Sequence, residues 1–253
     1  MEKIDAHRVK QRKIPLLFAP ERSDDLEEYL PWCEVNEFHQ EAELAFQSEV
    51  RLVLDGRGLG IALPAQKSYF YLSSIDIQAR IKAGRRGELA RACLGNKDSR
   101  LVLDAFAGFG VDGLTLAGLG ADVTLAERNL LVWLMLRSLA WGHPRVAIHF
   151  ADSIGLLQSG DVWDVVYLDP MFLPTKKSAL PKRDLQILRE ISDVAPSSKT
   201  YLEQLIEIAK DSATDRVVLK RRKNDPGAAE PNFTICSKTI CFDCRLYTSA
   251  AAD

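Results

Sequence analysis

Residues 101–112 read LVLDAFAGFGVD, and this stretch decides the fold of the chain. Apolar residues predict a buried strand that ends at Asp104, and Gly108 and Gly110 then predict a tight turn before a helix that begins near Asp112. The amide groups at the start of such a helix favour a negatively charged group. We therefore expect a cofactor cradle at the carboxyl end of the first strand of a doubly wound α/β sheet.

The alternation of strands and helices is regular from residue 100 onward. Hydrophobic runs predict strands at 101–105, 122–127, 146–152, 164–169 and 216–220, and helices at 111–120, 128–141 and 199–213. Residues 232–249 predict a closing antiparallel hairpin. Together these elements predict a seven-stranded, mostly parallel sheet that binds its ligands at the carboxyl ends of the strands.

Residues 1–74 differ from the rest and predict a small α+β lobe without a catalytic constellation. We expect this lobe to hold a strand at 13–18, a helix at 23–33 capped by Ser23, two strands around a glycine turn within 49–64, and a third strand at 68–74. We expect residues 75–253 to form the catalytic domain, which begins with a basic bridging helix at 75–99.

The composition is that of an ordinary globular protein, with 47% hydrophobic and 27% charged residues among 253. A net charge of −2 provides no global field that would attract nucleic acid, so local basic patches must carry any such function. No apolar run is long enough to span a membrane, and the amino terminus lacks a signal-peptide pattern. We therefore expect a cytoplasmic protein without membrane contact.

The five cysteines predict neither a metal site nor redox chemistry. Cys241 and Cys244 have the C-x-x-C spacing of metal and redox motifs, but no second pair of ligands accompanies them. We therefore expect reduced, mostly buried thiols and no bound metal.

Polar side chains follow the second and third predicted strands, where they would face the glycine turn. The carboxylate of Glu127 can accept hydrogen bonds from the two hydroxyls of a ribose, and Asp152 with Ser153 can bind the amino group of an adenine. The alternative for Glu127 is an ordinary surface glutamate at a strand end. Polar groups at three strand ends above one turn favour a nucleoside-containing cofactor.

The most specific motif is Asp169-Pro170-Met171-Phe172, which ends the strand at 164–169. It resembles the D/N-P-P-Y/F motif of methyltransferases that use S-adenosylmethionine (SAM) to modify amino groups. In this interpretation Asp169 and the carbonyl of Pro170 accept the hydrogens of the target amine, and Phe172 stacks on the extruded base. Met171 departs from the usual second proline, and a DPxF sequence also occurs as an ordinary strand-end turn.

The order of five segments resembles a family of small-subunit ribosomal RNA methyltransferases, the J type, which modifies the N2 of a guanine in 16S RNA. The resemblance covers residues 75–223, and YLDPMF followed by KKSAL is its most specific part. The five segments are ARIKAGRRGELARACLG, LVLDAFAGFGVDG, LAERN, VVYLDPMFLPTKKSAL and RVVLKR.

This resemblance implies a class I, Rossmann-like SAM-dependent methyltransferase whose partner is 16S ribosomal RNA or the small ribosomal subunit. Together with the glycine turn, it assigns donor binding to Gly108, Gly110, Val111, Asp112, Glu127, Arg128, Asp152, Ser153 and Asp169. Two positions depart from the family pattern, which usually has arginine where this chain has Val111 and serine where it has Asp152.

Basic residues cluster in three segments that could bind RNA phosphates around the active site. The expected RNA-binding residues are Arg85, Arg86, Lys176, Lys177, Lys182, Arg221 and Arg222, with Arg80, Lys82, Arg183, Lys220 and Lys223 beside them. For the bridging segment a solvated helix face is an equally plausible interpretation.

Other functions stay open at the level of sequence, and one is a methyltransferase that acts on another amino group of a nucleic acid or a protein. Gly108, Gly110 and Gly113 satisfy G-x-G-x-x-G, which together with Glu127 suits an NAD-dependent oxidoreductase. That function leaves the DPMF motif and the basic segments without a role. A third alternative is a non-catalytic RNA-binding protein, which would bind RNA independently of a methyl donor.

Overall fold

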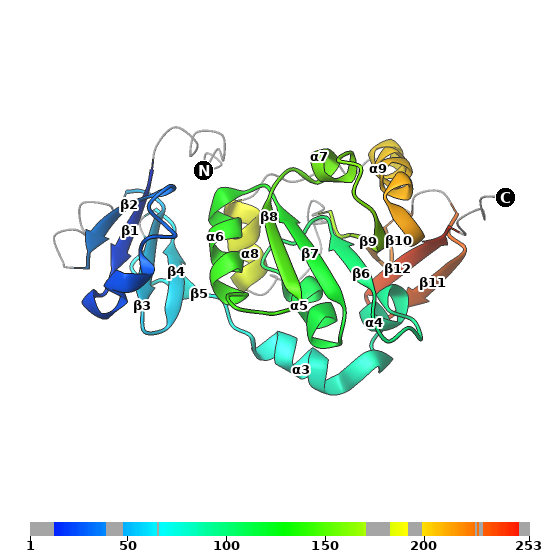
Figure 1. Ribbon diagram of the computed structural model, residues 1–253, viewed down its shortest axis with the longest axis horizontal. Coiled ribbons are helices and arrows are strands. Elements are labelled where there is room, and N and C mark those ends of the chain that lie inside the picture. Colours follow the sequence, from blue (N-terminus) through cyan, green and yellow to red (C-terminus); the bar gives the residue numbers. More distant parts are fainter. Residues whose placement is uncertain are drawn as a thin grey trace. The chain divides into compact units, whose positions relative to one another are not determined.

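A computed structural model describes residues 13–38, 48–64, 66–170, 183–191, 199–225, 227 and 230–247 (Figure 1). The chain divides into two compact units. The first comprises Met1–Ser73 with Leu134–Trp141, and the second comprises Ser74–Trp133 with Gly142–Asp253.

The first unit is built on a five-stranded mixed sheet in the order β2-β1-β3-β4-β5. Its elements are β1 (Ile14–Phe18), the 3-10 helix η1 (Pro20–Asp25), β2 (Cys33–Glu37), β3 (Arg51–Asp55), β4 (Gly58–Ala62) and β5 (Phe70–Tyr71). The predicted strands and the glycine turn of this lobe are confirmed, because β3 and β4 form an antiparallel hairpin that closes between Asp55 and Gly58.

The helix predicted at residues 23–33 is wrong. The segment holds only the short 3-10 helix η1, which begins at Pro20 instead of Ser23. Turns follow it, and Cys33 already belongs to β2, where it pairs with Ile14 of β1. Pro20 explains why η1 begins three residues earlier than predicted, because proline is favoured at the first position of a helix.

The second unit contains a seven-stranded sheet in the order β11-β12-β10-β9-β6-β7-β8 (Figure 1). Its strands are β6 (Leu101–Asp104), β7 (Asp122–Glu127), β8 (Val146–Phe150), β9 (Trp163–Leu168), β10 (Ala213–Arg222), β11 (Phe233–Cys236) and β12 (Ile240–Leu246). Its helical elements are α3 (Ile75–Ala83), η2 (Gly84–Arg86), α4 (Glu88–Cys93), α5 (Val111–Gly118), α7 (Ser153–Leu157), α8 (Arg183–Ile191), α9 (Lys199–Asp211) and the beginning of α6 (Leu130–Leu139), whose residues from Leu134 onward belong to the first unit.

The strand directions confirm the predicted class I, Rossmann-like sheet. β6 lies between β9 and β7 and is parallel to both, and β8 and β10 continue the parallel arrangement on either side. Only β12 runs antiparallel to its neighbours, in the closing hairpin with β11. The carboxyl ends of five parallel strands therefore meet at one edge, which we call the carboxyl edge.

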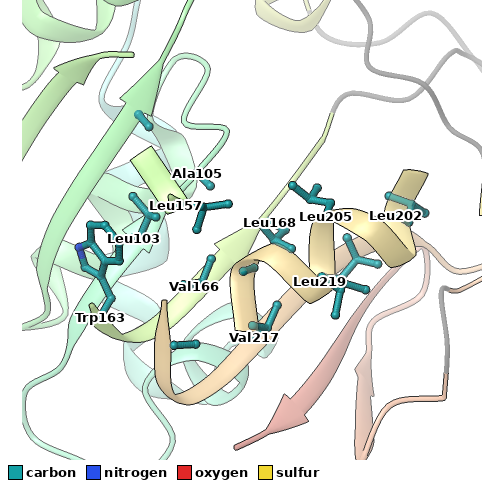
Figure 2. Packing of buried hydrophobic residues seen from close by; sticks show 14 residues of the cluster. Leu103, Ala105, Leu157, Trp163, Val166, Leu168, Leu202, Leu205, Val217 and Leu219 are labelled. Atoms are coloured by element: carbon teal, nitrogen blue, oxygen red, sulfur yellow. The ribbon is translucent and has the colours of Figure 1, made fainter. Parts of the chain in front are cut away.

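Helices α7 and α9 cover one face of this sheet, where they pack on apolar residues of the central strands. Figure 2 shows the cluster, in which the strand residues Leu103, Val166 and Val217 pack with Leu202 and Leu205 of α9. All five are almost completely buried. This core fixes β6, β9 and β10 side by side, and these strands provide the central groups of the site.

The bridging segment is not the single helix that was predicted. It breaks at Gly84, whose φ of 72° belongs to the left-handed region, and continues as η2 and α4. α3 packs against α5 so closely that a Cβ atom at Gly118 would overlap the side chain of Ile81. This contact requires a glycine at position 118.

The prediction of reduced thiols is wrong for two of the five cysteines. Cys236 and Cys241 occupy directly paired positions of the β11–β12 hairpin and form a disulfide. Cys33, Cys93 and Cys244 are free and buried, as expected.

The described ranges contain neither a membrane-spanning helix nor a metal-binding cluster. None of the helices described there is long and apolar enough to cross a membrane. The same residues include no group of three or more histidine, cysteine, aspartate or glutamate side chains that could hold a metal ion.

Candidate active site

The glycine turn at the end of β6 has the predicted backbone conformation. Gly108 and Gly110 have φ angles of 53° and 77°, which side chains other than glycine rarely tolerate. α5 begins at Val111, directly after the turn, so its first amide groups are available to a ligand there. Gly113 is needed for packing, because a Cβ atom at this position would lie only 2.9 Å from Asp104 Oδ2.

Glu127 lies at the end of β7 and is bonded to the glycine turn. Its Oε2 accepts a hydrogen bond from the amide of Gly108 at 3.1 Å, and its Oε1 accepts one from the amide of Asn129 at 2.7 Å. Each oxygen keeps a further lone pair, so both can still accept a ribose hydroxyl. Burial raises the pKa of Glu127, and the hydrogen bonds from the backbone amides of Asn129 and Gly108 oppose this shift.

The end of the third strand is only partly as predicted. The side chain of Asp152 is about half exposed. Its Oδ1 caps α7 by accepting a hydrogen bond from the amide of Ile154 at 3.0 Å, and its Oδ2 lies 3.5 Å from Arg128 Nη1. Ser153 instead is buried, and its hydroxyl donates to the carbonyl of Ala105 after β6. The hydroxyl of Ser153 thus connects two strand ends, Asp152 is accessible to a ligand, and the predicted roles of both residues in donor binding stay predictions.

Asp112 lies at the start of α5 as a buried carboxylate with three donors. Its Oδ2 accepts hydrogen bonds from the hydroxyl of Tyr167 at 2.6 Å and from Lys220 Nζ at 2.7 Å. Its Oδ1 accepts one from the guanidinium of Arg80 on α3. Burial alone would raise the pKa of Asp112, but the charges of Lys220 and Arg80 outweigh it and hold the pKa well below its usual range.

Asp169 follows the end of β9, and its Oδ2 accepts a hydrogen bond from Lys220 Nζ at 2.7 Å. Lys220 therefore bridges Asp169 and Asp112. Burial raises the pKa of Asp169, the charge of Lys220 opposes this shift and the charge of Asp112 adds to it. For Lys220, burial lowers the pKa, but the two carboxylates outweigh it, so the ammonium is firmly charged.

This role of Lys220 was not predicted from the sequence, because Lys220 was grouped with the basic residues expected to bind RNA. The register of the sheet explains its position. Leu219 of β10 pairs with Leu168 of β9, so Lys220 and Asp169 are the next residues of two adjacent parallel strands. Asp169 directly follows β9 and Lys220 lies near the end of β10, so the available signal was a pair of oppositely charged residues toward the carboxyl ends of two neighbouring strands.

A third carboxyl group, Asp104, lies at the end of β6 and is almost completely buried. Burial raises its pKa well above the usual range, and the neighbouring charges of Asp112 and Asp169 add to the shift. Its Oδ1 accepts a single weak hydrogen bond from the amide of Phe106 at 3.4 Å. Of the three carboxyl groups, Asp104 is thus the one whose charged form receives the weakest hydrogen bonding.

The rest of the DPMF motif is only partly described. Pro170 is buried directly after the strand end. Met171, Phe172, Lys176, Lys177 and Lys182 lie outside the described residues, so their predicted roles stay predictions.

Arg85 does not line the active site, which corrects the expectation from the sequence. Its guanidinium donates to the carbonyls of Lys97, Asp98 and Leu119. These carbonyls belong to the loops that precede β6 and β7, at the edge of the sheet opposite to the carboxyl edge. Arg86, the next residue of η2, is exposed.

Arg221 and Arg222 are both engaged in ion pairs. Arg221 donates to the buried carboxylate of Asp243 on β12, with distances of 2.7 Å and 3.1 Å. Arg222 donates to Asp225 at 2.6 Å. Arg221 thus connects β10 to β12 of the closing hairpin, and its expected role as an RNA contact stays a prediction.

The carboxyl edge fits the SAM that the resemblance implies. The glycine turn leaves backbone groups accessible, and Glu127 offers two acceptor oxygens to a diol. Asp152 presents an exposed carboxylate to an amino group at the next strand end. Asp169 lies along the same edge, so a methyl donor held by these residues would lie beside the amine-binding motif.

Comparisons with known proteins agree with this geometry. A family model described as a putative SAM-dependent methyltransferase matches residues 69–248. A ribosomal RNA small subunit methyltransferase J from Marinobacter nauticus is 34% identical over 74% of this chain and 71% of its own length. A protein of the same name from Thioalkalivibrio sulfidiphilus is 35% identical over 76% of this chain and 82% of its own length.

The fold also matches a solved structure. A SAM-dependent methyltransferase from Neisseria gonorrhoeae aligns with a TM-score of 0.65 and 21% sequence identity, over 94% of this chain and 97% of that one. The similarity at this level concerns the fold, and the sequence relatives decide the family. The chain is thus a SAM-dependent methyltransferase and belongs to the ribosomal RNA small subunit methyltransferase J family.

Proposed function

We propose that this enzyme transfers the methyl group of SAM to the exocyclic N2 of a guanine in 16S ribosomal RNA. The observation that supports it most is Asp169, a carboxylate held by Lys220 on one oxygen and 34% exposed, at the same edge as the glycine turn. The curated relatives are named as ribosomal RNA small subunit methyltransferases. We place the enzyme in the cytoplasm, together with this substrate.

The chemistry follows from the weak nucleophilicity of an amine conjugated to a ring. When bound, SAM supplies an activated methyl group. Asp169 and the carbonyl of Pro170 accept the two hydrogens of N2, and this orients the nitrogen lone pair for a direct displacement. The new N–C bond forms as the methyl–sulfur bond breaks, and N2 then loses a proton to solvent. Catalysis is therefore mainly positioning and electrostatic stabilisation, without a covalent enzyme intermediate.

Base capture and RNA binding belong to the same proposal. Phe172 would stack on the flipped guanine, because a base must leave the helix before its amine can reach the donor. Lys176, Lys177 and Lys182 follow Asp169 in the sequence and are our candidates for phosphate contacts. Arg86 is a weaker candidate, because it follows Arg85, which is bonded to loops at the opposite edge of the sheet. Arg222 is also a weaker candidate, because it forms an ion pair with Asp225.

Mass mapping of methylated nucleotides tests this function. Ribosomal RNA from cells with and without the gene should differ by one methyl group on one guanine of 16S RNA. Purified protein with SAM should restore that group, and protein carrying Asp169→Ala should not. Methylation that is identical in the two cell lines would contradict the proposal.

A further inference from the structure

We propose that Lys220 is a positioning residue for methyl transfer, which holds one oxygen of Asp169 and keeps this carboxylate ionised so that its other oxygen can accept the amine. The inference rests on the proposed function and assigns a further residue to the same site. Lys220 does not touch the reacting atoms in this proposal, because it acts through Asp169.

The geometry leaves Lys220 little freedom. Its Nζ lies 2.7 Å from Asp112 Oδ2 and 2.7 Å from Asp169 Oδ2, and its side chain is only 22% exposed. The two partners are 108 and 51 residues away in the sequence, on α5 and at the end of β9. Lys220 therefore connects the start of the cofactor helix to the carboxylate of the DPMF motif.

The charges around Lys220 nearly balance. Three carboxyl groups, Asp104, Asp112 and Asp169, face two cations, Arg80 and Lys220. Asp112 and Asp169, the two carboxylates that form ion pairs, are matched by these two cations. Removing Lys220 would leave the carboxylates of Asp112 and Asp169 with one cation, an arrangement that favours uptake of a proton.

Asp169 is the group that would take up this proton. Asp112 would keep Arg80 and Tyr167 as donors after the loss of Lys220. Among the described residues, Lys220 is the sole hydrogen-bond donor to Asp169. A protonated Asp169 is a weaker acceptor for the amine hydrogens than the charged form, so methyl transfer would slow at neutral pH and recover at higher pH.

The first test measures the ionisation of Asp169 without any substrate. Carbon-13 NMR of aspartate carboxyl groups, with the Asp169 signal assigned by Asp169→Asn, gives its pKa in the free protein. Lys220→Met should raise the pKa of Asp169 by one unit or more, a tenfold change in the ratio of its two forms at fixed pH. Lys238→Met, an exposed lysine in the β11–β12 turn, is the matched control and should leave it unchanged.

A second variant keeps the test decisive should Lys220→Met fail to fold. Asp112→Asn removes a negative neighbour that raises the pKa of Asp169, and it leaves Lys220 to serve Asp169 alone. The pKa of Asp169 should therefore fall, opposite in sign to the effect of Lys220→Met. A pKa that is the same in every variant would overturn the proposal.

Single-turnover methylation at saturating RNA and SAM provides the functional test. In Lys220→Met the acidic limb of the pH–rate profile should move to higher pH by the shift that NMR finds, and Lys220→Arg should restore the wild-type profile. A uniformly slow rate with an unmoved limb would show a merely structural role and overturn the proposal. If the wild-type protein methylated no 16S RNA, the proposed function would fail, while the NMR titration would still decide how Lys220 acts on Asp169.

Discussion

Lys220 and Arg221 are adjacent on β10, yet they belong to two different regions of the molecule. Successive side chains of a strand point to opposite faces. Lys220 bonds to Asp112 and Asp169 at the carboxyl edge, whereas Arg221 bonds to Asp243 on β12. One basic run in the sequence therefore supplies the active site with one residue and the closing hairpin with the next.

The two ion pairs also differ in what surrounds them. Asp169 is 34% exposed, as a group that must meet a substrate has to be, and Asp243 is 1% exposed. Asp243 accepts a further hydrogen bond from Thr234 of β11 at 2.9 Å. The ion pair of Arg221 and Asp243, with Thr234, thus connects β10, β11 and β12 at the end of the sheet. Loss of this ion pair should affect stability, whereas loss of the ion pair of Lys220 and Asp169 should affect methyl transfer.

The largest effect should come from Asp169, the residue through which Lys220 is proposed to act. Asp169→Ala should lower the single-turnover rate by about 10²–10³-fold, the usual loss when one preorganised hydrogen-bonding group that stabilises the transition state is removed. Asp169→Asn should retain more activity, since its amide oxygen can still accept one hydrogen bond. Adding Lys220→Met to Asp169→Ala should cost little more, because residues that act as a unit are not additive. Additive losses would separate Lys220 from Asp169.

Arg221→Met should affect stability instead of chemistry. It leaves the buried carboxylate of Asp243 without its charged partner, and breaking such a pair costs about 3–5 kcal/mol. Urea titration should show this loss in the free energy of unfolding, while the folded fraction keeps its methylation rate. A variant that is stable but slow would place Arg221 in the active site and erase the contrast with Lys220.

Glu127→Ala tests whether the cofactor half of the carboxyl edge works independently of Lys220. Loss of a charged hydrogen-bonding group should weaken SAM binding by about 1.5–3 kcal/mol. Isothermal titration should find the same loss of SAM affinity across the pH range in which Asp169 titrates. NAD should bind neither the wild-type protein nor the Glu127→Ala variant. Unchanged SAM affinity in the folded variant would remove Glu127 from the site.

The smallest effects concern RNA binding by two pairs of basic residues that are far apart in the sequence. Reversing the charges of Lys176 and Lys177 should reduce the slope of log affinity against log salt by roughly one unit for each phosphate that is no longer neutralised. Arg86→Glu should leave the slope unchanged, because Arg86 follows Arg85, which is bonded to loops at the opposite edge. An equal effect at both positions would mean that RNA wraps around the domain.

Much of the fold could be predicted from the sequence, because its signals are local. The apolar run before Asp104 and the glycines at 108 and 110 encode a strand, a turn and a helix start within twelve residues. Polar residues after successive strands predict one edge, since parallel strands end together. The 3-10 helix η1 and the break at Gly84 escaped prediction, although each begins at a residue with a special backbone preference: Pro20 starts η1, and Gly84 has a φ of 72°.

By itself, the sequence determined the parallel sheet, the glycine cradle, the acids at its strand ends and the family resemblance. Only the tertiary structure decided the partners of the charged residues: Lys220 with Asp169, Arg221 with Asp243, Arg85 with backbone carbonyls and the hydroxyl of Ser153 with Ala105. The physical reason is distance along the chain. These partners meet through strand register and helix packing, which no local sequence pattern specifies.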